Sequence, residues 1–169
     1  MLWTNRIFCG MIRDSVYLRN SQIQILGGIK SMRKVVKFGG SSLASAEQFK
    51  KVGDIIRADK GRKYVVPSAP GKRFDGDIKV TDMLYACYAK AEKKEDITAS
   101  VASIRERYME IINGLGLSLS LDDQFGIIAE NFKNLAGSDY AASRGEYLNG
   151  IIMANYLGYE FIDAAEVIV

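Results

Sequence analysis

The stretch KVVKFGGSSLASAEQFKKVGDIIRADKGRKYVV, residues 34–66, decides the fold. It opens on a short β-branched run, residues 34–38, which stops at two glycines. Ser45 then starts a capping-box pattern with Gln48, and apolar residues follow at helical spacing. A second β-branched run occupies residues 64–66. Because a strand, a capped helix and a strand fall within about thirty residues, the stretch predicts a βαβ unit with parallel strands and a right-handed crossover.

The chain beyond this unit predicts mostly helices, ending with two strands. Apolar residues recur at helical spacing in four segments, at about 81–93, 97–113, 121–137 and 139–158. We place the end of the second helix at Asn113-Gly114 and the cap of the fourth at Asp139. A strand is expected at 159–163 and another from Glu166. The alternation predicts an α/β protein with a parallel sheet. Because such sheets are normally covered on both faces, we expect the chain to be the N-terminal part of a longer protein.

Residues 1–31 lack the regularity of the rest of the chain. Polar and apolar residues mix there without a clear period, and no helix start is visible. We interpret residues 1–31 as an extension, disordered or an over-long start, and place the beginning of the folded domain near Met32. An ordinary arm docked on the domain is the alternative.

The composition excludes several kinds of site. The 169 residues include no histidine, which rules out a Ser-His-Asp triad and any histidine-ligated zinc or haem within the chain. Cys9 and Cys87 are the only cysteines, so a four-cysteine metal site is excluded and a reducing, cytoplasmic setting is favoured. The net charge of +3 is too mild and too dispersed to indicate nucleic acid or a membrane surface. No apolar run approaches the ~20 residues that span a bilayer.

The turn after the first strand is the first candidate site. Lys37 precedes Gly39 and Gly40, and Ser41 and Ser42 follow. The four amides from Gly39 to Ser42 can form a cluster of donors at a helix N-terminus, which suits a phosphate. Lys37 adds a mobile positive charge for a transferring phosphoryl group. A plain tight turn with a surface lysine is the alternative interpretation.

Two later segments carry further candidates. Ser68 follows the second strand at the sheet edge where ligands bind in open parallel sheets. Thr81 can cap the helix that it opens, or offer its hydroxyl to a carboxylate substrate. Gly145 interrupts a helix between Arg144 and Glu146. Because glycine costs about 1 kcal/mol relative to alanine inside a helix, we predict that another group approaches closely there. The alternatives are a loop serine, a capping threonine and an exposed helix face.

Five segments together resemble the aspartokinases of the amino acid kinase family. They are KVVKFGGSSLAS at 34–45, YVVPSAPGK at 64–72, KVTDML at 79–84, SRGEYLNG at 143–150 and FIDAAEVI at 161–168. The resemblance covers about Met32 to Val169 and leaves residues 1–31 unmatched. It implies an αβα sandwich with a parallel sheet, of which this chain would be the N-terminal half.

The resemblance also implies an activity. The full-length protein would transfer the γ-phosphoryl group of ATP to L-aspartate, giving 4-phospho-L-aspartate, the first step of lysine, threonine and methionine biosynthesis. It would do so in the cytoplasm, as a homo-oligomer. Mg²⁺ is expected with ATP, held mainly by phosphates and water, and we identify no metal-binding residue in the chain.

Individual residues receive roles from the same resemblance. Phosphate contacts are implied for Lys37, Gly39, Gly40 and Ser41, and Lys37 is the one that stabilises charge on the transferring phosphoryl group. Substrate contacts are implied for the hydroxyls of Ser68 and Thr81, for the carboxylate of Glu146, which would hold the ammonium group, and for Arg144 beside it.

The sequence departs from the family pattern in several places. Ser41 stands where threonine is commoner, which keeps the hydroxyl. The 169 residues lack the family's second substrate loop, its nucleotide segment and its C-terminal effector-binding domains. We therefore expect the 169-residue chain to be inactive on its own. A related kinase that acts on glutamate, acetylglutamate or UMP is one alternative. A non-catalytic binding module that keeps half of the fold is the other.

Overall fold

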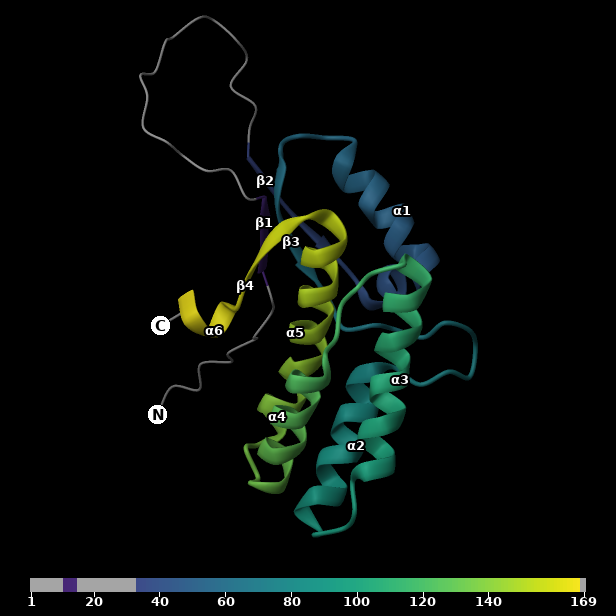
Figure 1. The fold of residues 1–169 in the computed structure, drawn as a ribbon, viewed down its shortest axis with the longest axis vertical. Coiled ribbons are helices and arrows are strands. Elements are labelled where there is room, and N and C mark those ends of the chain that lie inside the picture. Colours follow the sequence, from purple (N-terminus) through teal and green to yellow (C-terminus); the bar gives the residue numbers. More distant parts are fainter. Residues whose placement is uncertain (1–10, 15–32, 168–169) are drawn as a thin grey trace, which may run out of the picture.

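A computed structural model of the chain describes residues 11–14 and 33–167 (Figure 1). The strands are β1 (Met11–Asp14), β2 (Lys34–Phe38), β3 (Arg62–Pro67) and β4 (Tyr159–Ile162). A short 3-10 turn, η1 (Gly40–Leu43), follows β2. The helices are α1 (Ala46–Arg57), α2 (Val80–Glu92), α3 (Thr98–Leu115), α4 (Asp122–Lys133), α5 (Ser138–Leu157) and α6 (Ala164–Val167). The fold is therefore α/β, as the sequence predicts.

The four strands form one sheet in the order β2-β3-β1-β4. β2 and β3 are parallel, with Val36 opposite Val65, and α1 connects them, so the predicted βαβ unit is confirmed. β1 is antiparallel to both β3 and β4. It follows that β4 runs in the same direction as β2 and β3 without touching them. The predicted parallel sheet thus contains one antiparallel strand, because β1, which comes from the segment interpreted as an extension, lies between β3 and β4. The rest of that segment lies outside the described residues.

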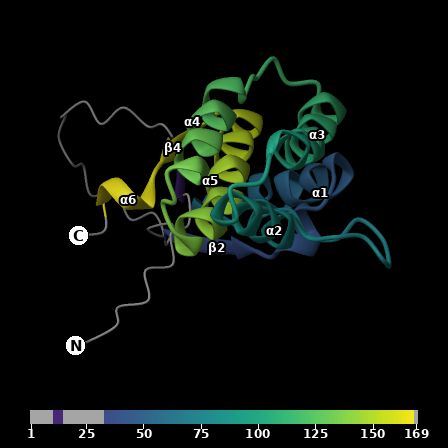
Figure 2. The same cartoon turned by 90° about the horizontal axis from the view of Figure 1, so that it is seen from below.

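The two faces of the β2–β3 pair differ in their surroundings. Side chains alternate along a strand. Val36 and Phe38 pack against the core, on the same face as the fully buried Val65. Val35 lies on the opposite face and is 65% exposed. Viewed from below, helices α1 to α5 all lie on one side of β2 (Figure 2). Helices α1 to α5 thus cover one face of the sheet and form the core with it.

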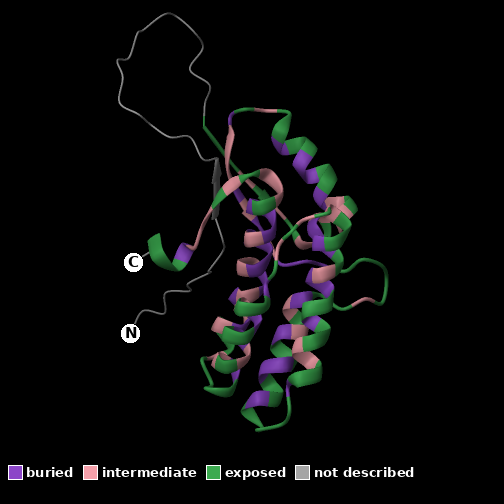
Figure 3. Ribbon diagram, viewed as in Figure 1, coloured by how far each residue is buried: buried purple, intermediate pink, exposed green. Residues whose placement is uncertain are grey.

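Most of the core lies among the helices. Buried residues form stripes along the facing sides of α2, α3 and α5 (Figure 3). In α3 the stripe contains Ile104, Tyr108 and Ile111, which follow one another at steps of four and three residues. This helical spacing of apolar residues is the pattern that predicts the helix from the sequence. Among the described residues, no helix is both long enough and apolar enough to cross a membrane.

Three details of the secondary structure differ from the sequence predictions: the end of α3, the cap of α5 and the type of the last element. α3 passes Asn113-Gly114 and ends at Gly116, whose left-handed backbone (φ 68°) terminates it. α5 begins one residue after Gly137, which is its N-cap, so Asp139 lies in the first turn and does not cap. Where a strand was expected from Glu166, residues 166–167 belong to the short helix α6, and residues 168–169 lie outside the described residues. Asp163 explains the last difference, because its carboxylate accepts from the Ala165 amide (3.0 Å) as a helix cap does.

The Ser45 cap of α1 is present and gives a first prediction. Ser45 is extended (φ −151°), and its Oγ accepts from the Gln48 amide at 3.4 Å. Because this hydrogen bond is long, we expect S45A to lower the free energy of unfolding by about 0.5–1 kcal/mol, the low end for cap removal. Urea unfolding measures the loss. S118A, in an exposed loop, is the control, and a loss no larger than the control's would contradict the cap.

Candidate functional site

A cavity of about 430 Å³ opens where the carboxyl ends of β2 and β3 meet α2 and α5. Its lining comprises Gly40, Ser41, Ser68, Ala69, Pro70, Gly71, Lys72, Lys79, Thr81 and Glu146. Five of the eight residues that receive roles from the family resemblance therefore share one cavity: Gly40, Ser41, Ser68, Thr81 and Glu146. The parallel pairing of β2 with β3 explains this, because it brings the turns that follow both strands to the same edge.

Two glycines allow the turn after β2 and the loop after β3 to touch through their backbones. The Gly71 amide donates to the Gly40 carbonyl at 2.8 Å. A Cβ atom at Gly71 would lie 2.6 Å from the Gly40 carbonyl carbon, and one at Gly40 would lie 2.8 Å from the Ala69 oxygen. Nothing lies within 4 Å of the corresponding position at Gly39. A side chain at Gly40 or Gly71 would therefore collide with the backbone of the opposite segment, so both positions require glycine. The space beside Gly39 is open.

The turn itself differs from the predicted cluster of four amides at a helix N-terminus. The Ser42 amide donates to the Gly39 carbonyl (3.1 Å) inside η1, so it is already bonded. The amides of Gly40 and Ser41 open this turn and have no partner within it. α1 starts only at Ala46, after the 3-10 turn. The amides of Gly40 and Ser41 can therefore act as donors at the turn, and the dipole of α1 is displaced from them.

Among the described residues, Glu146 is the only acidic one that lines the cavity. Burial raises the pKa of its carboxyl group above the ordinary value. Backbone N–H groups of Glu146 and Ala69 and the positive charge of Lys37 oppose this increase. Lys37 is exposed at the end of β2 and does not line the cavity, but its charge acts on Glu146. Lys37 is thus near enough to the Glu146 carboxylate to interact with it electrostatically.

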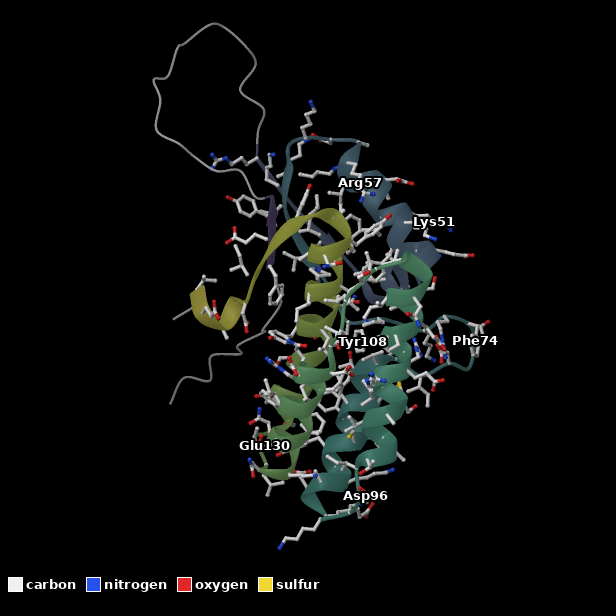
Figure 4. All side chains as sticks on the ribbon, in the orientation of Figure 1. Lys51, Arg57, Phe74, Asp96, Tyr108 and Glu130 are labelled. Atoms are coloured by element: carbon white, nitrogen blue, oxygen red, sulfur yellow. The ribbon has the colours of Figure 1, made fainter. Side chains whose placement is uncertain are left out.

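Gly145 lets α5 press against the loop after β3. A Cβ atom there would lie 2.6 Å from the Ala69 Cβ atom and 3.3 Å from a Leu84 methyl group, so the predicted close approach is confirmed. From α3, the buried Tyr108 hydroxyl donates to the Gly145 carbonyl at 2.8 Å (Figure 4). Burial raises the pKa of Tyr108 well above its ordinary value, so the hydroxyl stays a donor. These contacts fix the turn of α5 that carries Glu146.

Arg144, like Lys37 and Gly39, is a predicted residue that does not line the cavity. Two residues along a helix point to nearly opposite sides, so Arg144 faces away from Glu146. Its guanidinium lies over the rings of Tyr140 (4.5 Å) and Tyr147 (4.6 Å) and donates to the Ser143 hydroxyl. The stacking gives Arg144 a packing role on α5.

Lys72 and Lys79 line the cavity without having been singled out in the sequence. Both belong to the loop between β3 and α2, whose path no periodic pattern predicts. Their ammonium groups, the hydroxyls and the two free amides suit an anionic ligand such as a phosphate or a carboxylate. Among residues 11–14 and 33–167, no three Asp, Glu, Cys or His side chains are grouped so as to hold a metal ion.

Comparison with known proteins shows which proteins the chain is similar to. The sequence model of the amino acid kinase family matches residues 32–169. Aspartokinase 3 of Bacillus subtilis is 39% identical over 137 residues, which cover 78% of this chain and 30% of that protein. The crystal structure of Clostridium acetobutylicum aspartate kinase has 52% sequence identity and a TM-score of 0.75, over 79% of this chain and 31% of that one.

A more distant likeness concerns the fold alone. Aspartokinase III of Escherichia coli, solved in complex with aspartate and ADP, has 22% identity and a TM-score of 0.54, over 73% of this chain and 28% of that one. The chain thus spans about 30% of the length of the B. subtilis protein and 31% of the C. acetobutylicum chain.

Proposed function

The chain belongs to the amino acid kinase family, and we propose that the full-length protein transfers the γ-phosphoryl group of ATP to the side-chain carboxylate of L-aspartate. The product would be 4-phospho-L-aspartate, which begins lysine, threonine and methionine synthesis. One observation carries the proposal: Ser68, Thr81 and Glu146 line the same cavity as the Gly40–Ser41 turn. The names of the B. subtilis and C. acetobutylicum relatives support aspartate as the acceptor.

The loop and α5 side of the cavity suits an acidic amino acid. The Glu146 carboxylate would hold the ammonium group, and the Ser68 and Thr81 hydroxyls would donate to a carboxylate. Lys72 and Lys79 contribute two positive charges and Glu146 one negative charge, which leaves one net positive charge in the lining. L-aspartate carries one net negative charge at neutral pH, so the charges are complementary.

The turn after β2 suits the phosphoryl group. The free amides of Gly40 and Ser41 would contact phosphate oxygens, and Lys37 would stabilise the charge that develops during transfer. The attacking oxygen belongs to a carboxylate that is already ionised at neutral pH, so no general base is needed. This agrees with a chain that contains no histidine. Mg²⁺ bound to the nucleotide would neutralise part of the phosphate charge.

The test of the proposed function is a substrate panel with the full-length protein. We expect ATP-dependent formation of aspartyl hydroxamate, and much less product with glutamate, acetylglutamate or UMP. Phosphorylation of one of these three in place of aspartate would identify a related kinase. No turnover with any of the four, and no binding of ATP, would leave the binding module as the better hypothesis. The 169 residues alone are expected not to turn over, and measurable activity from them would contradict that expectation.

Replacing Glu146 by glutamine should weaken aspartate binding specifically. Loss of one charge-assisted hydrogen bond predicts an increase in KM for aspartate of about 10- to 100-fold. Protonation of Glu146 removes the negative charge that would hold the ammonium group, so KM for aspartate should rise as the pH falls. Because burial raises the pKa of Glu146, this rise in the wild type should start at a higher pH than it would with a glutamate of ordinary pKa. E146Q should lose this pH dependence. E130Q, an exposed position on α4, is the control, and an equal KM in both variants would exclude the ammonium contact.

A further inference from the structure

Arg107, on α3, is a buried arginine outside the proposed substrate site. Its side chain is 6% exposed, yet its guanidinium reaches the loop between β3 and α2 at three residues. Nη2 donates to the Gly71 carbonyl at 2.9 Å, and Nη1 donates to the Ile78 carbonyl at 3.1 Å. Nη1 also donates to both oxygens of Asp77, at 3.0 and 3.1 Å. One side chain therefore joins the two ends of the segment 71–78.

The positions of these bonds connect Arg107 to the cavity. Gly71 immediately precedes Lys72, and Ile78 immediately precedes Lys79. Both lysines line the cavity, whereas Arg107 does not. The part of the loop between them projects away from the helices, and Phe74 lies on this projecting part (Figure 4). Without Arg107, a backbone hydrogen bond would remain across the base of the loop, in which the Val80 amide donates to the Pro70 carbonyl at 3.1 Å.

Charge keeps the guanidinium in this position. Asp77, 8% exposed, also accepts from the backbone amide and Nε of Arg73, both at 2.9 Å. Arg73 in turn pairs with Glu110 on α3 at 2.6 Å. The hydrogen bond from Arg73, helped by the charge of Arg107, holds the pKa of Asp77 well below its usual range. The carboxylate is thus ionised at any pH at which the protein would be assayed, and it compensates part of the cost of burying Arg107.

We propose that Arg107 is a positioning residue for substrate binding, which holds Lys72 and Lys79 where they contact the carboxylates of the acidic amino acid. The proposal rests on the proposed function for the identity of the substrate. Burying a charged arginine costs free energy unless all its donors are bonded, and the Nε of Arg107 has no partner in the described part of the chain. Burial of Arg107 is therefore only partly compensated, which favours a role for its contacts to the loop. A planar fork can reach two carbonyls and a carboxylate together, which the single ammonium of a lysine cannot do.

Kinetics of the full-length protein test the effect on the substrate. We expect R107M to raise KM for aspartate by about tenfold or more, with a smaller change in kcat. R107K should recover only part of the loss, because it can hold one end of the segment but not both. The matched control is R105M, which removes an exposed arginine of the same helix that also pairs with an aspartate, Asp122. An R107M enzyme with the KM of R105M would overturn the proposal.

A multiple-mutant comparison tests the route through the lysines. In a protein that already carries K72M and K79M, R107M should raise KM for aspartate little further, because the groups that it positions are absent. A full tenfold increase in that background would show that Arg107 acts on the site in another way, and would overturn its role as a positioning residue for the lysines.

Hydrogen exchange tests the placement of the loop without any substrate. Amides of residues 71–80 should exchange at least about tenfold faster in R107M than in R105M, while those of α1 and α5 stay unchanged. This outcome does not depend on which reaction the protein catalyses, so it separates the present proposal from the proposed function. Unchanged exchange in the loop would refute the positioning role even for an active kinase. Should R107M fail to fold, R107K answers the same question.

Discussion

Replacement of Lys37 by methionine is expected to lower kcat of the full-length protein by about 10²- to 10³-fold. Lys37 is the cation at the end of β2, next to the turn whose free amides belong to Gly40 and Ser41. Phosphoryl transfer depends mainly on charge stabilisation and positioning, so removal of this charge should affect the transition state more than the bound aspartate. KM for aspartate should change much less than kcat. A coupled assay of ADP formation measures both values.

Two further variants sharpen this experiment. K51M removes an exposed lysine of α1 (Figure 4) and should leave kcat unchanged, which controls for net charge. K37R keeps the charge and should recover part of the rate. Because Lys37 is itself exposed, K37M should unfold at the same urea concentration as the wild type. If K37M kept kcat within about threefold of the wild-type value, the plain-turn interpretation of the first candidate site would be correct.

Gly71→Ala is the second change with a large expected effect, although it adds a single methyl group. That methyl would lie 2.6 Å from the Gly40 carbonyl carbon and 2.7 Å from the Ser41 amide nitrogen, and neither backbone atom can move aside as a flexible side chain could. The turn and the loop must therefore separate, which breaks the 2.8 Å bond from the Gly71 amide to the Gly40 carbonyl. We expect a stability loss of about 1–3 kcal/mol.

Activity should fall more than stability in G71A. The separation moves the phosphoryl side of the cavity away from the substrate side, and misplacement by about 1 Å can cost 10²-fold in rate. Urea unfolding and the hydroxamate assay measure the two effects at a temperature where the variant is folded. The control is G126A on α4, where an added methyl meets nothing within 4 Å and should be neutral or stabilising. Wild-type activity in G71A would show that the two loops need not touch.

Local patterns in the sequence were sufficient for the unit β2-α1-β3. Its strands are β-branched runs, and Ser45 marks the start of its helix, so the information lies within a few residues of each element. The strand prediction was wrong for residues 166–167 because one capping side chain, Asp163, outweighs a weak preference of the residues after it. β1 escaped prediction because its four residues show no period, and its partners lie far along the chain.

The candidate site was predictable only in part for a similar reason. Ser68 follows directly from its place at the end of a parallel strand, and Gly145 from the energetic cost of glycine in a helix. Lys72, Lys79 and Arg107 acquire their positions from the path of a loop and from contacts across 29 to 36 residues, which no local pattern records. Their roles, like those of Lys37 and Glu146, stay predictions until the variants are measured.

The antiparallel strand β1 has a consequence for the chain during its synthesis. β1 leaves the ribosome before both of its partner strands, and Val65 of β3 follows about 50 residues later. β4 is complete only at Ile162, about 100 residues after that. At roughly 5–20 residues per second, one side of β1 stays open for about 5–20 s in each nascent chain. An open strand edge can pair with a strand of another chain. We therefore expect crowded polysomes, and slow codons between Val65 and Ile162, to favour misassembly. Early binding of a chaperone should oppose it.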